Sequence, residues 1–340
     1  MNGSTHARLR DLLNGFQATQ ALHAAAALRL PDLIAQGCAS SRELAACAGV
    51  EPAALDRLLG VLVALQVIAK DERARYRLAS MGEQLRSDAP GSWHFWALLI
   101  GQPAIRAAWD QLVPAMRAGR NAFAHAHGTD IWTHRSRDPD AGRLFDEVMR
   151  CGTERLSAAL AGRLRKLAWQ HAVDVGGGEG TLLSSLLRHR PGGTGALLER
   201  PGPAARARIL LAEEGLATRC RVVEGDFFRQ VPAGGDLYIL KFILHDWDDE
   251  AAASILHCCH RAAVAGHPQA RLAVVERLLD AAQGSTEAAL SDLNMLVNTG
   301  GRERTAQQYA TLLGKSGFHI EQVECFAGSI ALMVAAPIRC

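Results

Sequence analysis

The stretch HAVDVGGGEGTLLSSLLRHRPGGTGALLER, residues 171–200, contains the pattern that decides the fold. A short apolar run ends in Asp174, and four glycines follow it within five positions, at 176–178 and 180. A helical stretch comes next, and a second apolar run ends in another acid, Glu199. Strand, glycine-rich turn, helix and strand in this order predict a parallel α/β unit that binds a small molecule at its glycines.

The rest of the C-terminal half continues this alternation. The apolar runs AVDV, GALLE, CRVVEG, DLYILK and RLAVVE alternate with helical segments such as TLLSSLLRH and AAASILHCCHRAA. Alternation of this kind favours a parallel sheet with helices on both faces. The last two runs, HIEQVECF and SIALMVAAP, are joined by a short Ala-Gly turn, so a terminal antiparallel hairpin is expected to close the sheet.

The N-terminal segment predicts helix after helix and then a wing. Apolar residues at helical spacing run over 9–30 and are expected to stop at Pro31. A second helix should begin at Ser40 with Glu43 as its capping partner, and a third should cover 52–66. The segment 70–78 then predicts a short two-stranded wing.

Helix, helix, helix, wing is the order of a winged helix, so DNA binding has to be considered. The helix 52–66, which would enter the groove, is almost wholly apolar and carries a single base, Arg57. A DNA-reading helix needs several basic or amide side chains. The apolar faces therefore favour packing against a partner, most simply a second copy of the chain.

The segment between these two halves is rich in aromatic residues. A loop at 87–91 is expected to mark a boundary, which predicts an organisation of 1–90, 91–168 and 169–340. Seven aromatics lie in the middle segment: Trp93, Phe95, Trp96, Trp109, Phe123, Trp132 and Phe145. They either form ordinary core or line a wall for a flat ligand, and both interpretations stay open.

Bulk composition excludes some classes of protein. A length of 340 residues suggests about two domains, and a net charge of +2, from 37 basic and 35 acidic residues, gives no attraction to nucleic acid or to a membrane surface. The eight cysteines form no CxxC pair and are expected to be reduced. Without a signal-peptide pattern or an apolar run of membrane-spanning length, a cytoplasmic protein is expected.

Several polar residues fall at the predicted carboxyl ends of strands, where open α/β sheets bind ligands. They are Asp174, Gly176, Gly177, Gly178, Gly180, Glu199, Asp226, Lys241 and Glu276. A phosphate-binding P-loop needs Gly-Lys-Ser/Thr, but Gly180 is followed directly by Thr181. A dinucleotide is disfavoured because Thr181 takes the third glycine position of the GxGxxG pattern and because Glu179 would repel the diphosphate.

A nucleoside ligand without phosphates fits these residues better. Glu199 would accept hydrogen bonds from ribose hydroxyls, and Asp226 from an adenine amino group with Phe227 against the ring. S-adenosylmethionine is such a ligand, and its sulfonium cation tolerates nearby carboxylates. Glycines 176–178 would let the backbone approach its aminoacyl part closely.

Five motifs in sequence order carry a resemblance to a known family. VDVGGGEGTLL, VVEGDFF, VPAGGDLYILKFILHDWDDE, AVVERLL and DLNMLVNTGGRERT resemble the successive motifs of the bacterial and plant small-molecule O-methyltransferases. The match runs from about residue 10 to the end and includes FAHAHGTDIW and the helix around Phe145–Met149. It implies a Rossmann-like class I methyltransferase sheet, preceded by an all-α winged-helix dimerisation domain, with S-adenosylmethionine as cofactor and S-adenosylhomocysteine as product.

A base is expected because a phenol with a pKa of about 10 is mostly protonated at neutral pH. His245 follows a predicted strand end among acids, and it matches the catalytic histidine of the family. By the same resemblance, Glu276 and Glu303 orient this histidine, and Lys241 and Asp246 lie near the cofactor. For Glu303, an ion pair with a neighbouring arginine, Arg302 or Arg304, remains the alternative.

The acceptor pocket is expected to use aromatic, methionine and asparagine side chains, which suit a flat ring. The candidates are Phe145, Met149, Phe242, Trp247, Asn294, Met295 and Asn298, with plain core packing as the alternative. No metal is expected. The acids Asp246, Asp248, Asp249 and Asp292 are explained by a solvated helix start, and His125, His127 and His134 by a family loop at His127-Gly128.

The sequence departs from the family pattern at three positions: Glu179 replaces a threonine, Glu199 an aspartate and Gln308 a glutamate. None removes the base. The main hypothesis is an O-methyltransferase that acts on an aromatic secondary metabolite of polyketide or phenazine type, as in antibiotic biosynthesis, and forms a homodimer without nucleic acid or membrane. The alternatives are N-methylation or non-methylating chemistry on the same fold and cofactor, and a regulatory winged-helix protein that senses S-adenosylmethionine.

Overall fold

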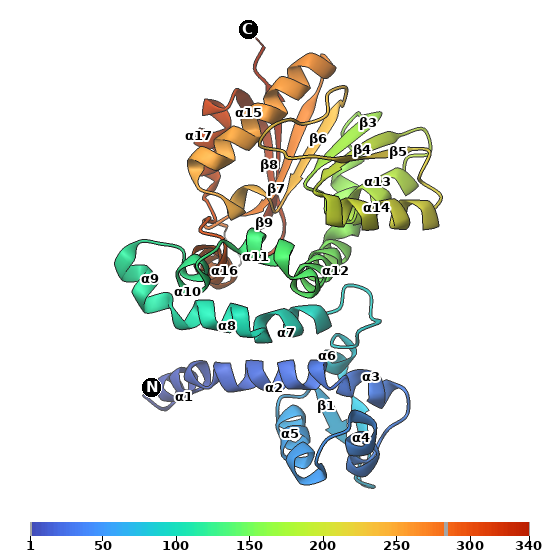
Figure 1. Cartoon of the computed structure of the whole chain (residues 1–340), viewed down its shortest axis with the longest axis vertical. Coiled ribbons are helices and arrows are strands. Elements are labelled where there is room, and N and C mark those ends of the chain that lie inside the picture. The colour runs from blue at the N-terminus through green and yellow to red at the C-terminus, as the bar shows by residue number, and fades with distance from the viewer. Residues whose placement is uncertain (1, 282–284, 340) are drawn as a thin grey trace. The chain divides into compact units, whose positions relative to one another are not determined.

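The computed structural model describes residues 2–281 and 285–339, which form two compact units. One unit contains Met1–Arg106 and Pro139–Gly152, and the other contains Ala107–Asp138 and Thr153–Cys340. This division differs from the three consecutive segments expected from sequence, because each unit takes part of the middle segment. Figure 1 shows the order of the elements along the chain.

The first unit is helical with a short wing. Its elements are α1 (Asn2–Leu13), α2 (Gly15–Ala27), α3 (Leu30–Ala35), α4 (Ser41–Ala48), α5 (Pro52–Ala64), β1 (Ile68–Lys70), β2 (Tyr76–Leu78), α6 (Ser80–Glu83) and α7 (His94–Gly101). Strands β1 and β2 pair antiparallel, so the predicted wing is confirmed. Apolar residues of α3, α4 and α5, among them Leu30, Leu44, Leu55, Leu59 and Leu62, form its core.

The prediction of one helix ending at Pro31 was wrong. The helical stretch divides at Asn14 into α1 and α2, α2 ends at Ala27, and Pro31 lies in the first turn of α3. Proline suits a first turn because the backbone N–H that it lacks would have no partner in the helix there. The cap predicted at Ser40 is confirmed: its Oγ accepts the amide of Glu43 at 3.3 Å, and the Glu43 carboxylate accepts the amide of Ser40 at 2.9 Å.

Helices α8 (Pro103–Asp110) and α12 (Pro139–Leu164) each run from one unit into the other. The second unit also contains α9 (Leu112–Ala118), α10 (Ala122–His127), α11 (Ile131–Arg137) and a seven-stranded sheet in the order β5-β4-β3-β6-β7-β9-β8. The strands are β3 (His171–Val175), β4 (Thr194–Glu199), β5 (Cys220–Glu224), β6 (Leu237–Lys241), β7 (Arg271–Arg277), β8 (Phe318–Ala327) and β9 (Ile330–Pro337).

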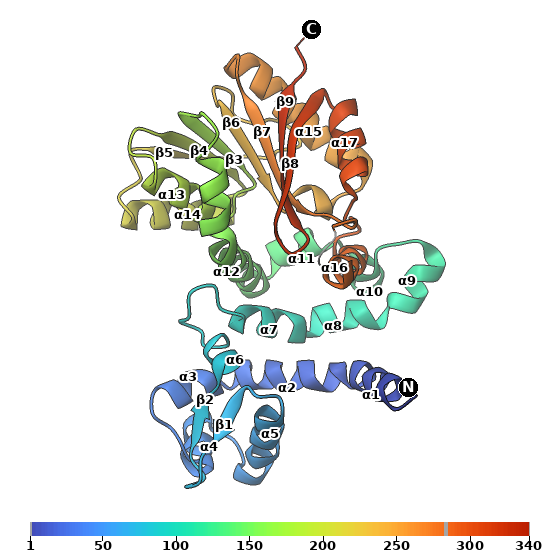
Figure 2. The same ribbon diagram turned by 180° about the vertical axis from the view of Figure 1, so that it is seen from behind.

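Strands β3 to β7 are parallel, and β9 runs antiparallel to both β7 and β8. The predicted parallel sheet with a terminal hairpin is therefore confirmed, and Figure 2 shows the hairpin at one end of the sheet. Strands β4 and β5 lie on one side of β3, and strands β6 to β9 lie on its other side, so the strand order reverses at β3. Ligands bind at such a reversal in open α/β sheets, beyond the carboxyl ends of the strands.

Both faces of the sheet are buried under helices, as the continuous apolar runs require. Alternate strand residues such as Val173 and Tyr238 pack against α15 (Asp249–Gly266) and α17 (Ala306–Lys315). Their neighbours, such as Ala172 and Ile239, pack against α13 (Thr181–Arg188), α14 (Pro201–Glu213) and the end of α12. Figure 1 shows the two helical layers on either side of the sheet. None of the helices in the described residues is long and apolar enough to cross a membrane.

Candidate active site

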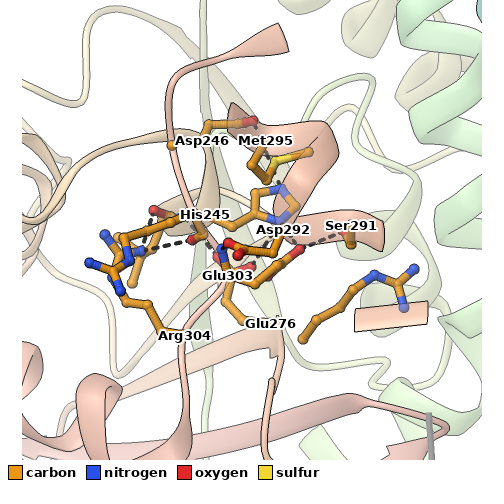
Figure 3. A network of polar contacts seen from close by, with 12 residues as sticks. His245, Asp246, Glu276, Ser291, Asp292, Met295, Glu303 and Arg304 are labelled. Atoms are coloured by element: carbon orange, nitrogen blue, oxygen red, sulfur yellow. Dashed lines mark hydrogen bonds and ion pairs between the residues drawn. The ribbon is translucent and has the colours of Figure 1, made fainter. Parts of the chain in front are cut away.

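His245 lies in a short 3₁₀ turn, η1 (Leu244–Asp246), directly beyond the carboxyl end of β6. Its Nδ1 is 3.0 Å from Oε1 of Glu303 and 3.5 Å from Oε2 of Glu276 (Figure 3). The His245 side chain is 13% exposed, whereas both glutamates are fully buried. The structure thus brings together the three residues that the sequence proposed as a catalytic group.

Glu276, in the penultimate position of β7, is fixed by the loop that carries the histidine. Its Oε1 accepts hydrogen bonds from the amides of Ile243 at 3.0 Å and Leu244 at 2.7 Å. Burial raises the pKa of Glu276 to about 7, although the nearby charge of His245 works against this shift. The carboxylate therefore ties β7 to the turn and leaves Oε2 directed at the imidazole.

Glu303 is fixed by α16 (Ser285–Asn298). Its Oε1 also accepts the hydroxyl of Ser291 at 2.7 Å, and its own amide donates to Oδ1 of Asp292 at 2.8 Å. Burial opposes the ionised form, but the charge and hydrogen bond of His245 prevail and lower the pKa of Glu303. Glu303 is thus a partner of the histidine, and the alternative pairing with an adjacent arginine is not observed.

Arg304 instead holds the turn that carries His245. Its guanidinium is 1% exposed and donates to the carbonyl oxygens of Leu244 and Trp247, each at 2.9 Å, and to Oδ1 of Asp249 at 2.8 Å. A planar five-donor group suits such a fixed set of acceptors. Arg304, which is distant in sequence, therefore fixes the backbone on both sides of His245.

The electrostatics of the group suit a base whose charged form is stabilised. Burial disfavours a charged imidazole, but Glu276 and Glu303 outweigh burial and raise the pKa of His245 to about 10. Because Nδ1 faces acceptors, it keeps its proton in both forms of the ring, so Nε2 is the nitrogen that gains or loses a proton when His245 titrates. Asp246 Oδ1 lies 3.9 Å from Nε2.

Phe242 lies flat against the base. Its ring stacks on that of His245 at 5.5 Å with 16° between the planes. Phe242 has φ +55°, a left-handed conformation that is rare for a bulky residue and is often found at functional sites. Lys241 Nζ lies 4.9 Å from the centre of the same ring.

The glycine loop folds around two of the predicted carboxylates. A Cβ at Gly177 would be 2.4 Å from Oδ2 of buried Asp174, so a side chain here would displace that carboxylate. The amide of Gly178 donates to Oε2 of Glu199 at 3.1 Å, and that of Arg200 donates to its Oε1 at 2.7 Å. Burial raises the pKa of Glu199.

Asp226 and Phe227 follow β5 at the same edge. Asp226 is exposed, and its Oδ1 accepts the amide of Phe228 at 2.9 Å. A Cβ at Gly176 would lie 3.4 Å from the ring of Phe227, which places that ring against the glycine loop. The predicted ribose and adenine contacts thus lie on adjoining strand ends.

Lys241 lies between the residues predicted to hold the cofactor and His245. Burial lowers its pKa, while the charges of Asp174 and Glu276 oppose that effect. Burial likewise raises the pKa of Asp174 to about 7, against the attraction of Lys241. The half-buried Lys241 therefore interacts electrostatically with Asp174 beside the glycine loop and with Glu276 beside His245.

Glu179 does not act as an isolated charge in the loop. Its carboxylate forms an ion pair with Arg206 of α14 at 2.6 Å. Repulsion of a diphosphate by Glu179, on which the sequence prediction against a dinucleotide rested, is weakened by this partner. The exclusion of a dinucleotide therefore depends on Thr181 and on the family match.

The predicted acceptor residues fall into two groups. Phe242 and Trp247 flank His245 in the chain, and Asn294, Met295 and Asn298 lie on α16, where Asn298 donates to Oδ1 of Asn294 at 2.7 Å. Phe145 and Met149 lie on the part of α12 that belongs to the first unit. Their place in an acceptor pocket stays a prediction.

The possible metal ligands named from sequence do not cluster. Among the described residues, His245, Glu276 and Glu303 form the one group of three potential ligands whose donor atoms lie within 4.8 Å of one another. Asp248 instead caps α15 through the amide of Ala251 at 2.8 Å. The histidine rings at 127 and 134 contact Phe123.

Sequence reasoning missed three residues that shape this site. Ser291 and Arg304 hold Glu303 and the His245 turn, and Trp132 stacks on Trp247 at 5.9 Å. Arg304 was visible as a neighbour of Glu303 in the GGRERT motif, and Trp132 as one of the aromatics of the middle segment. Ser291 carries no local signal, because its hydroxyl acts across 12 residues of chain.

Comparison with known proteins gives two matching family models. An O-methyltransferase domain matches residues 109–319, and an O-methyltransferase dimerisation domain matches residues 10–88. The chain is 34% identical to a phenazine O-methyltransferase, PhzM, of Lysobacter antibioticus, over 97% of this chain and 96% of the relative. It is 38% identical to the O-demethylpuromycin-O-methyltransferase of Streptomyces alboniger, over 97% of this chain and 89% of the relative.

The crystal structure of LaPhzM superposes with a TM-score of 0.90 at 33% identity, over 98% of this chain and 99% of that one. Relatives with other reactions are similar too. A phenazine-1-carboxylate N-methyltransferase of Pseudomonas aeruginosa is 33% identical, and an aclacinomycin 10-hydroxylase of Streptomyces purpurascens is 34% identical. Similarity of sequence alone therefore does not distinguish between these reactions.

Proposed function

Because this chain belongs to the O-methyltransferase family of S-adenosylmethionine-dependent enzymes, we propose that it methylates a hydroxyl group of an aromatic natural product. The observation that carries the proposal is the contact of His245 Nδ1 with two buried carboxylates, at 3.0 and 3.5 Å. An aromatic hydroxyl needs such a base because its oxygen is a poor nucleophile while protonated.

The residues that would hold the cofactor lie at the ends of β3, β4 and β5. The glycines of the loop admit the backbone close to the ligand, Glu199 accepts from the ribose, and Asp226 accepts from the adenine beside Phe227. When bound, S-adenosylmethionine supplies the electrophilic methyl group and a sulfonium cation, whose charge disfavours a second cation on His245.

His245 then acts as general base in the transfer. Nε2 accepts the hydroxyl proton while the acceptor oxygen forms a bond to the methyl carbon and the bond from that carbon to sulfur breaks. Glu276 and Glu303 hold the ring through Nδ1 and stabilise the imidazolium that results. The ring of Phe242 stacks on the imidazole and covers one of its faces.

The acceptor is proposed to be flat and aromatic, of polyketide or phenazine type. One support is the nature of the side chains around His245: Phe242 and Trp247 flank it in the chain, and Met295 lies beside it in Figure 3. The other is that two relatives are named for a phenazine and for O-demethylpuromycin. N-methylation or a non-methylating reaction is the second candidate, favoured by the two relatives named for such chemistry.

The dimerisation-domain match supports a homodimer. Exposed apolar residues at the N-terminus add to this support, since Leu9, Leu12, Leu13 and Phe16 are each more than half exposed. The cytoplasmic location expected from the sequence stays a prediction.

The test is mass spectrometry of the full chain with S-adenosylmethionine and matched pairs of aromatic acceptors, each pair differing only in a hydroxyl or an amino group. The expected result is that a hydroxyl acceptor gains the mass of one methylene unit and that one S-adenosylhomocysteine forms for each acceptor methylated. Methylation of the amino partners alone would favour the second candidate, and cofactor binding without any methylated product would contradict methyl transfer to this class of acceptor.

A further inference from the structure

Three aromatic side chains of the second unit meet at Trp247, which lies two residues after His245. Trp132 of α11 stacks on it, with ring centres 5.9 Å apart and 22° between the planes. Phe227 and Phe228 present their edges to the same indole, at 6.3 Å and 4.8 Å. Phe227 lies against the glycine loop, so the cluster adjoins the place proposed for adenine.

Two arginines fix the indole of Trp132. Arg200 places its guanidinium carbon 5.5 Å from the ring centre, and Arg135 places its own at 5.2 Å. Arg200 follows Glu199 directly, and its amide donates to that carboxylate at 2.7 Å. Trp132 therefore connects the end of β4 with the turn that follows β6.

The start of α11 sets the direction of this side chain. Oδ1 of Asp130 accepts the amides of Trp132 and Thr133, each at 2.9 Å, and Oδ2 accepts the hydroxyl of Thr133 at 2.7 Å. A capped first turn restricts the backbone of Trp132. The indole is thus presented to Trp247 by a rigid element.

We propose that Trp132 is a cofactor-positioning residue, and that α11 is a cap which closes the adenosine end of the site by stacking Trp132 on Trp247. The two indoles form one wall, Phe227 another, and Arg200 anchors the cap beside the ribose carboxylate Glu199. This inference rests on the proposed function, because it takes S-adenosylmethionine as the ligand.

The cap also reaches the base. The charge of Arg135 acts on Asp246 and opposes the effect of burial, which raises the pKa of that carboxyl to about 6. Asp246 in turn lies 3.9 Å from Nε2 of His245. The charge of Arg135 therefore acts on the carboxylate that lies on the Nε2 side of His245.

Cofactor affinity tests the proposal directly. Dissociation constants for S-adenosylmethionine and S-adenosylhomocysteine are measured by calorimetry for the wild type, Trp132→Ala and Trp132→Phe. Trp132→Ala removes an aromatic wall and its two cation contacts, so the affinity for both ligands should fall about tenfold. Trp132→Phe keeps an aromatic ring and should recover most of this affinity. The KM of the acceptor should change less than the KM of the cofactor.

Arg137→Ala is the matched control, because Arg137 is exposed on the last turn of the same helix and should leave both affinities unchanged. If Trp132→Ala and the wild type bound the cofactor with the same affinity, within twofold, the proposal that α11 caps the site would be wrong. The proposed function would not be affected. Absence of S-adenosylmethionine binding in the wild type would instead overturn the proposed function, and the cap with it.

A spectroscopic signature keeps the test valid if Trp132→Ala is unstable. Two stacked indoles should give a coupled near-ultraviolet circular dichroism signal that is lost equally in Trp132→Phe and Trp247→Phe. S-adenosylmethionine should change this signal in the wild type at the same concentrations that saturate the calorimetric titration. A signal that Trp132→Phe leaves intact, or that a bound cofactor does not alter, would contradict the proposal.

Discussion

The two halves of the site are built in different ways. On the cofactor half, Glu199 accepts amides from Gly178 and Arg200, within 21 residues of chain, and Asp226 stays exposed. On the base half, His245 and Glu303 meet across 58 residues, and the carboxylates of Glu276 and Glu303 are fully buried. On the half proposed for the cofactor, Asp226 is exposed and Glu199 is half-buried, whereas the other half uses its buried acids on its own histidine.

This difference teaches which property each half controls. A carboxylate that accepts from a loop amide and faces a ligand contributes to binding. A carboxylate that is buried against an imidazole sets the pKa and the tautomer of that ring. Substitutions on the cofactor half should therefore change affinity, and those on the base half should change rate and pH dependence.

The largest effect short of removing the base is expected from Glu303→Gln. With one carboxylate gone, the imidazolium is less stable, and kcat should fall about 10²-fold because the base is less well held and stabilised. The dissociation constant of S-adenosylmethionine should stay within a few fold. Glu250→Gln, an exposed position on α15, is the control. A tenfold loss of cofactor affinity with unchanged kcat would reverse the assignment of the two halves.

The pH profile of the same variant sharpens the comparison. A base works in its neutral form, and the pKa of His245 is raised to about 10, so wild-type kcat/KM should rise with pH through the alkaline range. Removal of the Glu303 charge lowers that pKa, and the acidic limb should move to lower pH. Initial rates from pH 6 to about 10.5 would show this shift. An acidic limb at the same pH in both proteins would contradict control of the base by Glu303.

A change of the opposite kind is expected from Glu199→Ala. Loss of the charged acceptor should weaken S-adenosylmethionine binding about 10- to 100-fold, which corresponds to about 1.5–3 kcal/mol for a hydrogen bond to a charged group. At saturating cofactor, kcat should remain within a few fold of the wild type. Glu224→Ala serves as control, since Glu224 pairs with Glu199 in the register of β4 and β5 but is exposed. Equal affinities in the two variants would exclude Glu199 as a ribose acceptor.

The smallest effect is expected in the first unit, far from either half along the chain. Ser40→Ala removes the side-chain cap of α4 and should lower the free energy of unfolding by about 1 kcal/mol. Ser40→Thr should keep most of that stability, and both variants should methylate at the wild-type rate well below their unfolding temperature. Denaturant midpoints measure the first effect, and a change in the methylation rate of either variant would show that the cap matters beyond stability.

The fold could be predicted from sequence largely because its signals are local. The alternation of apolar runs and helices identified the sheet and the hairpin, and the Ser40 cap and the wing were visible in short segments. The break at Asn14 and the helix that includes Pro31 were missed, because apolar spacing over 9–30 is the same for one helix as for two. The division into units could not be predicted, because it depends on which part of the middle segment packs with which unit.

The candidate site was predictable in part for the same reason. The residues proposed for the cofactor lie at strand ends that chain order reveals, whereas Glu276 and Glu303 were assigned to His245 only through resemblance to the family. Ser291, Arg304 and Trp132 act across long stretches of chain, on Glu303, on the His245 turn and on Trp247 respectively. No spacing in the sequence marks such contacts.

The central claim is that His245 removes the acceptor proton, and single-turnover kinetics test it most directly. Enzyme loaded with S-adenosylmethionine is mixed with a hydroxyl acceptor, and the methylated product is followed for the wild type, His245→Ala and His257→Ala, the last an exposed histidine on α15. The single-turnover rate should fall at least about 10²-fold in His245→Ala, with cofactor affinity retained, and should not change in His257→Ala. A His245→Ala rate equal to that of the wild type would contradict it.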